Sequence, residues 1–299
     1  MVLAARVMRF ALRRSPFAVP MMRPSRSNTS VRPPAVAGFF YPDDPAELRD
    51  TVSGLIERAR SPSQSAGPAT LTYIVPHAGY VYSGGVAASA YGHMKRSGLQ
   101  PRRIVVIGPS HRVYLQGIAT CEAGAFRTPL GDIPVDAQAK RALLERGDVV
   151  LSDVPHAQEH SLEVQLPFLQ ALFDDFELVP LVVGSAAAPH VAAVLDAVAH
   201  DADTLLLASS DLSHYLTYEE ARRVDADTNA RILNFANTLS GEQACGAVAL
   251  NGLLTLAKDR RASIAPLALM NSGDTAGDRS RVVGYAAYAI DDHRTARPQ

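Results

Sequence analysis

The sequence predicts a three-layer α/β domain built around a central, mostly parallel mixed sheet. Three apolar runs, residues 71–75, 104–107 and 204–208, lack a polar face, which is typical of strands buried on both sides. Proline, glycine or serine follows each run and ends the strand. Segments with helical patterns separate the runs, and strands that alternate with helices indicate a sheet covered by helices.

The first part of the expected domain leads into the sheet. Residues 31–42 are rich in proline and aromatic residues, so we expect an extended segment. An acidic cap followed by a proline predicts a helix over residues 43–60. Residues 61–70 have the composition of a solvated loop. Residues 83–96 contain many small side chains, which allow a helix to pack closely on the sheet.

Strands and helices continue to alternate in the rest of the chain. We expect further strands at residues 117–121, 149–151, 176–183, 264–270 and 282–290. We expect further helices at residues 136–146, 160–173, 189–199, 219–237 and 241–258. Residues 126–136 predict a hairpin-like excursion. No repeat or linker interrupts residues 31–291, which we therefore expect to form a single domain.

The two ends of the chain differ in composition from this domain. Residues 1–32 hold seven arginines and no acidic residue. This composition is typical of an organelle transit peptide, and it also resembles a weak signal peptide or an over-long start preceding Met21 or Met22. We expect residues 1–30 to be a disordered extension or such an over-long start, and residues 292–299 to be a C-terminal tail.

Charge and cysteine content restrict the classes of function. Of the 29 basic residues, 22 follow residue 32, as do all 30 acidic residues, which gives the body a net charge of about −8. An acidic body argues against a nucleic-acid partner, because phosphate binding needs a basic face. Two cysteines form no disulfide framework, so we expect a reducing, cytoplasmic location. No run approaches the ~18 apolar residues of a membrane span.

A histidine lies just beyond each of the three buried runs: His77, His111 and His214. In parallel α/β sheets, ligands bind in the crevice beyond the carboxyl ends of the strands, so the three side chains are expected to converge there. Taken singly, each has an alternative interpretation as a capping or core-edge histidine.

Cysteine and carboxylate side chains join this expected site. Cys245 is predicted in the first turns of a helix, where the helix dipole lowers the pKa of a thiol; the alternative is a small buried core residue. Imidazole and thiolate together favour iron, copper or zinc over magnesium or calcium. Asp211 is expected to orient the His214 ring. Glu163 follows His160 at the spacing of one helical face.

Five motifs together resemble those of the Memo family, which is named for a mediator of cell motility. They are Pro76–Tyr80, Gly108–His111, Phe126–Leu130, Glu159–Pro167 and Ser209–His214. The motifs occur in the family's order, and the resemblance covers residues 31–291.

The resemblance implies a fold shared with class III extradiol dioxygenases, which bind non-haem Fe(II) through two histidines and a glutamate. His77 and His111 match the Memo histidine ligands, and Cys245 matches the cysteine that replaces the glutamate. Asp211 and His214 match further site residues, and the His214 loop resembles the loop of the dioxygenases' acid–base histidine. The cysteine counts against ring cleavage, because a thiolate is softer, binds copper well and can itself be oxidised.

Two classes of function follow from these residues. The first is a redox enzyme that uses non-haem Fe(II) or copper, with zinc also compatible, on a small or protein-borne substrate. The second is a non-catalytic module that binds a metal or a peptide in the same crevice. The resemblance also implies radical-SAM and Ammecr-type proteins as partners. The expected roles are metal binding for His77, His111 and Cys245, proton transfer for His214 and Asp211, and a place beside the crevice for His160, Glu163 and Ser110.

Overall fold

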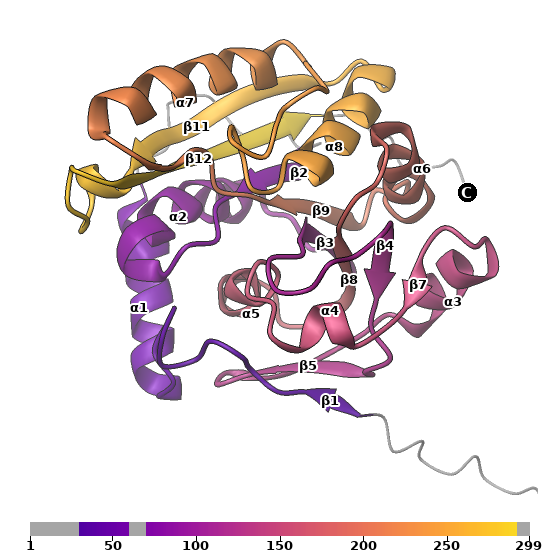
Figure 1. Ribbon diagram of the computed structural model, residues 1–299. Coiled ribbons are helices and arrows are strands. Elements are labelled where there is room, and N and C mark those ends of the chain that lie inside the picture. The colour runs from indigo at the N-terminus through magenta and orange to yellow at the C-terminus, as the bar shows by residue number, and fades with distance from the viewer. Residues whose placement is uncertain (1–29, 60–69, 292–299) are drawn as a thin grey trace, which may run out of the picture.

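The computed structural model describes residues 30–59 and 70–291 (Figure 1). The expectations for the N-terminal extension, apart from Ser30, and for the C-terminal tail lie outside the described residues. Within these two ranges, no helix combines the length and the apolar character needed to cross a membrane.

One large mixed sheet organises the described residues. Its nine strands follow the order β10-β12-β2-β9-β3-β8-β4-β7, with β11 also paired to β12. The four central strands, β2 (Thr70–Val75), β9 (Thr204–Ser209), β3 (Arg103–Pro109) and β8 (Glu177–Val183), run parallel. Antiparallel pairs flank them, β12 against β2 and β4 against β8. The flanking strands are β4 (Ile118–Thr120), β7 (Val150–Leu151), β10 (His214–Leu216), β11 (Ser263–Asn271) and β12 (Val282–Asp291).

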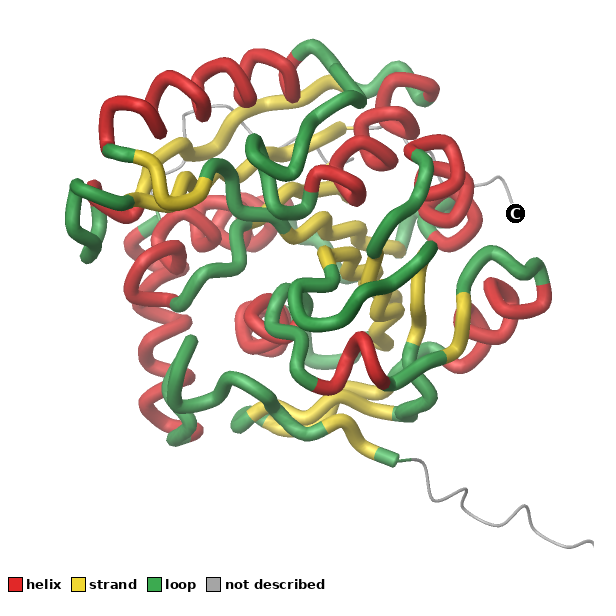
Figure 2. The backbone as a smooth tube through the Cα atoms, in the orientation of Figure 1, coloured by secondary structure: helices red, strands yellow, loops and turns green. Residues whose placement is uncertain are grey.

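Helices cover both faces of this sheet, which confirms the predicted α/β architecture (Figures 1 and 2). The helices are α1 (Pro45–Arg58), α2 (Tyr80–Ser97), α3 (Ala137–Glu145), α4 (Val154–Ala157), α5 (Leu166–Leu172), α6 (Ala188–Val198), α7 (Tyr218–Leu233) and α8 (Ala247–Asp259), with 3-10 turns η1 (Glu163–Gln165) and η2 (Ser272–Asp274). Successive β3 residues alternate between two cores. Ile104 and Val106 pack with α1, α2 and α5, whereas Val105 and Ile107 pack with α3, α6 and α8.

Two helices begin later in the chain than the sequence predicts. The helix expected from residue 241 begins at Ala247, because the preceding segment is held against the end of β9. The backbone N–H of Gly246 donates to Ser210 Oγ at 2.9 Å, and a Cβ at Gly246 would lie 2.7 Å from the Ser210 side chain. Likewise, His160 lies in a turn, and helical structure begins only at Glu163.

The N-terminal segment joins a second, smaller sheet. The predicted hairpin is present as β5 (Ala125–Thr128) and β6 (Gly131–Pro134), and β1 (Val31–Arg32) pairs with β5 in parallel. The chain then crosses to α1 and passes beside the turn that carries Glu163.

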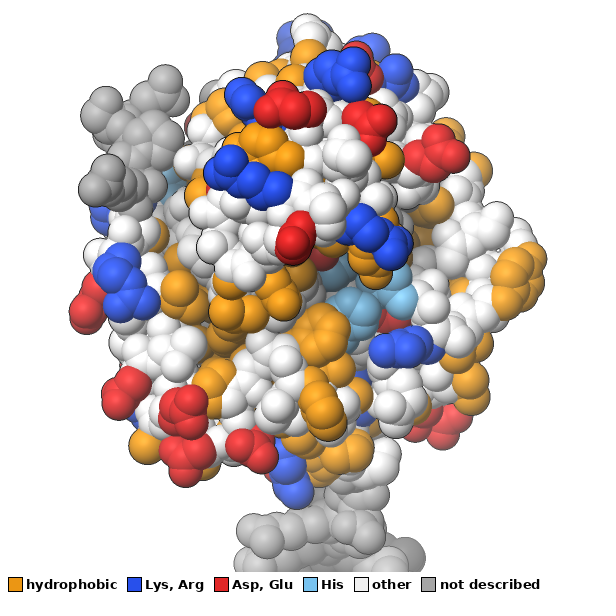
Figure 3. All heavy atoms as spheres, turned by 60° about the vertical axis from the view of Figure 1, so that its left-hand side comes forward, with side chains coloured by type: hydrophobic (Ala, Val, Ile, Leu, Met, Phe, Trp, Pro, Cys, Tyr) orange, Lys and Arg blue, Asp and Glu red, His pale blue; other side chains and the backbone are white. Residues whose placement is uncertain are grey.

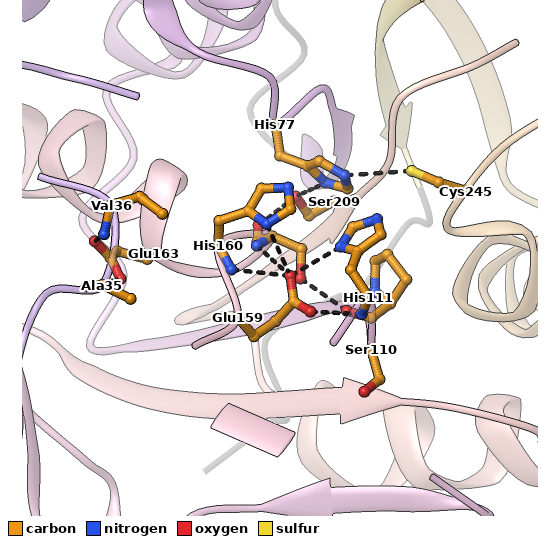
Figure 4. Close-up of polar contacts among 12 residues, drawn as sticks. Ala35, Val36, His77, Ser110, His111, Glu159, His160, Glu163, Ser209 and Cys245 are labelled. Carbon is orange, nitrogen blue, oxygen red and sulfur yellow. Dashed lines mark hydrogen bonds and ion pairs between the residues drawn. The ribbon is translucent and has the colours of Figure 1, made fainter. Parts of the chain in front are cut away.

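Glu163 fixes this segment and does not reach the crevice. Its carboxylate is fully buried and accepts hydrogen bonds from the Ala35 N–H at 2.8 Å, the Val36 N–H at 3.0 Å and the Tyr41 hydroxyl at 2.6 Å. It also forms an ion pair with Arg32. Figure 4 shows Glu163 apart from the histidines, facing Ala35 and Val36. The expected place beside His160 is therefore not observed, because no helix joins the two residues.

We expect the Glu163→Gln variant to be destabilised by about 3–5 kcal/mol, because it leaves the buried Arg32 guanidinium without its counter-charge. Urea unfolding measures this loss. Glu57→Gln, on the exposed side of α1, is the matched control and should stay within about 0.5 kcal/mol of wild type. Full stability in Glu163→Gln, with loss of bound metal instead, would place Glu163 in the crevice.

Candidate metal site

Three histidine side chains meet beyond the ends of the central strands. His77 follows β2, His111 follows β3, and His160 precedes η1. One nitrogen of each ring lies within 4.8 Å of the others. Among the described residues, these three side chains are the ones placed closely enough to bind a metal ion together. The rings of His111 and His160 stack with centroids 4.6 Å apart, and His77 meets both edge-on (Figure 4). The structure therefore brings His77 and His111 together, as the parallel strands predict.

The hydrogen bonds of His77 fix which ring nitrogen carries the proton. Ser209 Oγ donates to the Ser161 carbonyl oxygen at 2.6 Å, and a carbonyl can only accept. Ser209 Oγ must therefore accept from His77 Nδ1, which lies 2.9 Å away. This leaves a lone pair on His77 Nε2. Burial, followed by the charges of the neighbouring histidines, holds the pKa of His77 well below its usual value, so the ring is neutral at pH 7.

Glu159 fixes His111 in the same way. Its buried carboxylate accepts from His111 Nδ1 at 2.9 Å and from the backbone N–H groups of His111, His160 and Ser161 at 2.6, 2.9 and 2.9 Å. Burial raises the pKa of Glu159, but the hydrogen bonds and charge of His111 outweigh it and lower this pKa to about 2. Glu159 is thus ionised, and because it holds Nδ1, Nε2 is the His111 nitrogen that faces the cluster as a possible ligand. In the sequence, Glu159 is distinguished only as the first residue of the Glu159–Pro167 motif.

His160 completes the cluster with an unsatisfied nitrogen. Its Nδ1 is buried and has no hydrogen-bond partner, since Glu159 Oε1 lies 3.4 Å away in poor geometry. Burial lowers the pKa of His160 to about 4, and the Phe40 ring packs against it with centroids 4.7 Å apart. Three converging imidazoles, two with Nδ1 held by a hydrogen bond and one with an orphaned nitrogen, fit a late first-row metal ion.

Cys245 lies beside His77. Its Sγ is 3.2 Å from His77 Nε2 and 3.9 Å from Ser210 Oγ, in the turn before α8. Burial, followed by the charge of Asp211, raises the pKa of this thiol to about 12. The expectation of a pKa lowered by a helix dipole is wrong, because Cys245 lies before the helix, where desolvation of its thiol and the Asp211 charge raise the pKa instead. A metal must therefore displace the thiol proton to bind here.

Asp211 and His214 do not form the expected pair. Asp211 Oδ1 accepts from the backbone N–H of His77 at 2.7 Å, and His214 Nδ1 donates to the Leu212 carbonyl oxygen at 2.9 Å. Asp211 therefore holds the His77 backbone and does not orient the His214 ring. Burial raises the pKa of Asp211 to about 7 against the hydrogen bond from His77. Burial likewise lowers the pKa of His214.

Ser110 serves the turn that presents His111. Its hydroxyl donates to the Val113 carbonyl oxygen at 2.6 Å and points away from the histidines in Figure 4. Its role is to close the turn after β3.

Two cavities open onto the cluster. A cavity of about 640 Å³ is lined by His77, His160 and Asp211, and one of about 1180 Å³ is lined by Cys245. His111 and His214 line both. Figure 3 shows histidine side chains at the bottom of a hollow in one face of the molecule. The cluster is therefore reachable from solvent on either side.

The fold and this cluster define an α/β protein with a candidate metal site beyond the ends of its parallel strands. The model of the family described as "Memo-like protein" matches residues 32–289. The chain belongs to the Memo family.

Archaeal relatives match along almost their whole length. A MEMO1 family protein of Ignicoccus hospitalis is 39% identical over 279 residues, covering 86% of this chain and 97% of that protein. Those of Methanopyrus kandleri and Desulfurococcus amylolyticus are 37% and 35% identical, with the same coverage. The solved structure of an uncharacterized Escherichia coli K12 protein aligns with a TM-score of 0.49 at 14% identity, covering 73% of this chain and 98% of that one.

We expect His77→Ala and His111→Ala each to lose most of any metal ion that binds at this cluster, because each removes one of the converging ring nitrogens. Metal analysis of anaerobically purified protein measures this. His200→Ala removes an exposed histidine outside the cluster and should keep its metal. If His111→Ala keeps the full metal content of the wild type, the metal does not bind at this cluster.

Proposed function

We propose that this protein binds iron or copper through His77, His111 and Cys245 and catalyses a redox reaction on a small or protein-borne substrate. One observation carries the proposal. Ser209 and Glu159 hold the Nδ1 atoms of both histidines, so Nε2 is the nitrogen that each ring can offer to a metal, and Cys245 Sγ lies 3.2 Å from that of His77.

The donor set indicates the kind of metal. Two imidazoles and a thiolate favour iron or copper, and they are also compatible with zinc. A thiolate adds the negative charge that three imidazoles lack, which supports Cys245 over His160 as the third ligand. When bound, iron or copper supplies one-electron oxidation and reduction at the centre of both cavities.

His214 is suited to move a proton. Because its Nδ1 donates to Leu212, its Nε2 carries the lone pair, and its lowered pKa keeps the ring neutral at pH 7. It lines both cavities, so it can accept a proton from a substrate in either one. Asp211 contributes by holding the His77 backbone in place.

A non-catalytic binding module is the second candidate, and one observation favours it. Phe39, Tyr82 and Tyr215 line the 640 Å³ cavity with 89%, 41% and 64% of their surface exposed. Exposed aromatic side chains around a hollow are typical of a surface that binds another molecule, such as a peptide.

Proton release tests the third ligand. The Cys245 thiol, with its pKa of about 12, is protonated at every working pH, so its ligation displaces one proton per metal ion. We expect the metal affinity of the wild type to increase with pH more steeply than that of Cys245→Ser, by an additional factor of about ten per pH unit. Titration calorimetry in buffers of different ionisation enthalpy counts these protons. If the wild type and Cys245→Ser release the same number of protons, and His160→Ala loses the metal, then His160 is the third ligand.

We expect His214→Ala to keep most of its metal and to lose redox turnover, because it removes a proton acceptor and no ligand. Metal content and oxygen uptake driven by ascorbate, on protein freed of loose metal, measure the two effects, with His200→Ala as the control. If His214→Ala loses metal as fully as His77→Ala, the site has four protein ligands. The non-catalytic function would then be favoured.

A further inference from the structure

We propose that the 640 Å³ cavity binds a small organic acid, whose carboxylate is recognised by Arg112 and Arg281. Its apolar part would lie against Phe40 and Tyr215, which line the same cavity. The inference rests on the proposed function only in that the reactive end of the acid faces the histidine cluster. Recognition of the carboxylate depends on the arginines alone.

The two arginines lack hydrogen-bonded and ionic partners among the described residues. Across residues 30–59 and 70–291, neither Arg112 nor Arg281 forms an ion pair or a side-chain hydrogen bond, whereas Asp211 in the same cavity is bound to the His77 backbone. Asp278 also lines the cavity, so the exposed charged side chains sum to +1, which suits a monoanion. A guanidinium group matches the two oxygens of a carboxylate with parallel hydrogen bonds.

Arg281 is held in place by an unusual tyrosine. Its guanidinium lies 5.0 Å from the centre of the Tyr215 ring. Tyr215 has a φ of 60°, a left-handed conformation that costs energy for a bulky residue, and it lies where the pairing of β10 with β12 is irregular, between His214 and Leu216. Strained, exposed residues beside a cluster of reactive groups point to ligand binding, because core packing does not account for them.

Apolar side chains also line this cavity. Phe39 and Phe40 contribute to the cavity wall, and Phe40 also covers the His160 ring. Hydrophobic and basic side chains surround the histidines in Figure 3. The volume falls within the range of about 300–1,000 Å³ typical of small-molecule sites. A ligand with both an anionic and an apolar part would contact both the arginines and these aromatic side chains.

Matched probes test this proposal on the full-length protein. Phenylacetate and phenylacetamide have nearly the same shape and differ in charge, and phenyl phosphate carries a second negative charge. We expect phenylacetate to bind at least about tenfold more tightly than the amide by titration or ligand-observed NMR. The double variant Arg112→Gln/Arg281→Gln should lose this preference while binding the amide unchanged. Arg222→Gln, an exposed substitution on α7, is the control.

Each contrary outcome overturns the proposal. Equal affinity for the acid and the amide, or a preference that survives the double variant, would exclude recognition by the arginines. Much tighter binding of phenyl phosphate would assign the cavity to phosphate esters. The same titrations on metal-loaded and chelator-treated protein should agree. A preference that disappears with the metal would mean that the acid binds the metal ion instead. Conversely, an unchanged preference in a protein without redox activity would separate this inference from the proposed function.

Discussion

The buried carboxylate of Glu159 is the group on which the site depends most. It accepts four hydrogen bonds, from the ring and backbone of His111 and from the backbone N–H groups of His160 and Ser161. These bonds join the loop after β3 to the turn before η1. Ser161 extends the connection, because its carbonyl oxygen accepts from Ser209 at the end of β9. One ionised side chain thereby couples segments that are about fifty residues apart in the sequence.

The sequence predicts the parts of the fold and site that depend on buried strands. Apolar runs identify β2, β3 and β9, and because these strands are parallel neighbours, the residues that follow them must lie at one edge of the sheet. His77 and His111 could therefore be placed together in advance. His160 could not be placed at a strand end, since it enters from a turn that precedes a helix.

The errors have a common origin in local spacing. A separation of three residues suggested that Glu163 lies beside His160 on a helix and that Asp211 binds His214 within one loop. The chain turns between His160 and Glu163, and Asp211 binds the His77 backbone instead. Glu163 instead neutralises Arg32, which is 131 residues away, and a backbone carbonyl takes the N–H of His214. Long-range partners of this kind, like the left-handed Tyr215, depend on how distant segments pack and leave no pattern within a short window of sequence.

The hydrogen bonds that hold the rings of His77 and His111 have a consequence for how a metal ion could bind there. Their ring orientations are fixed by Ser209 and Glu159 through bonds that need no metal, so no refolding step has to precede capture. Ligation by Cys245, as proposed, would add only the loss of the thiol proton. The entropy of ordering the two rings would thus be lost during folding and would not weaken the binding of an ion.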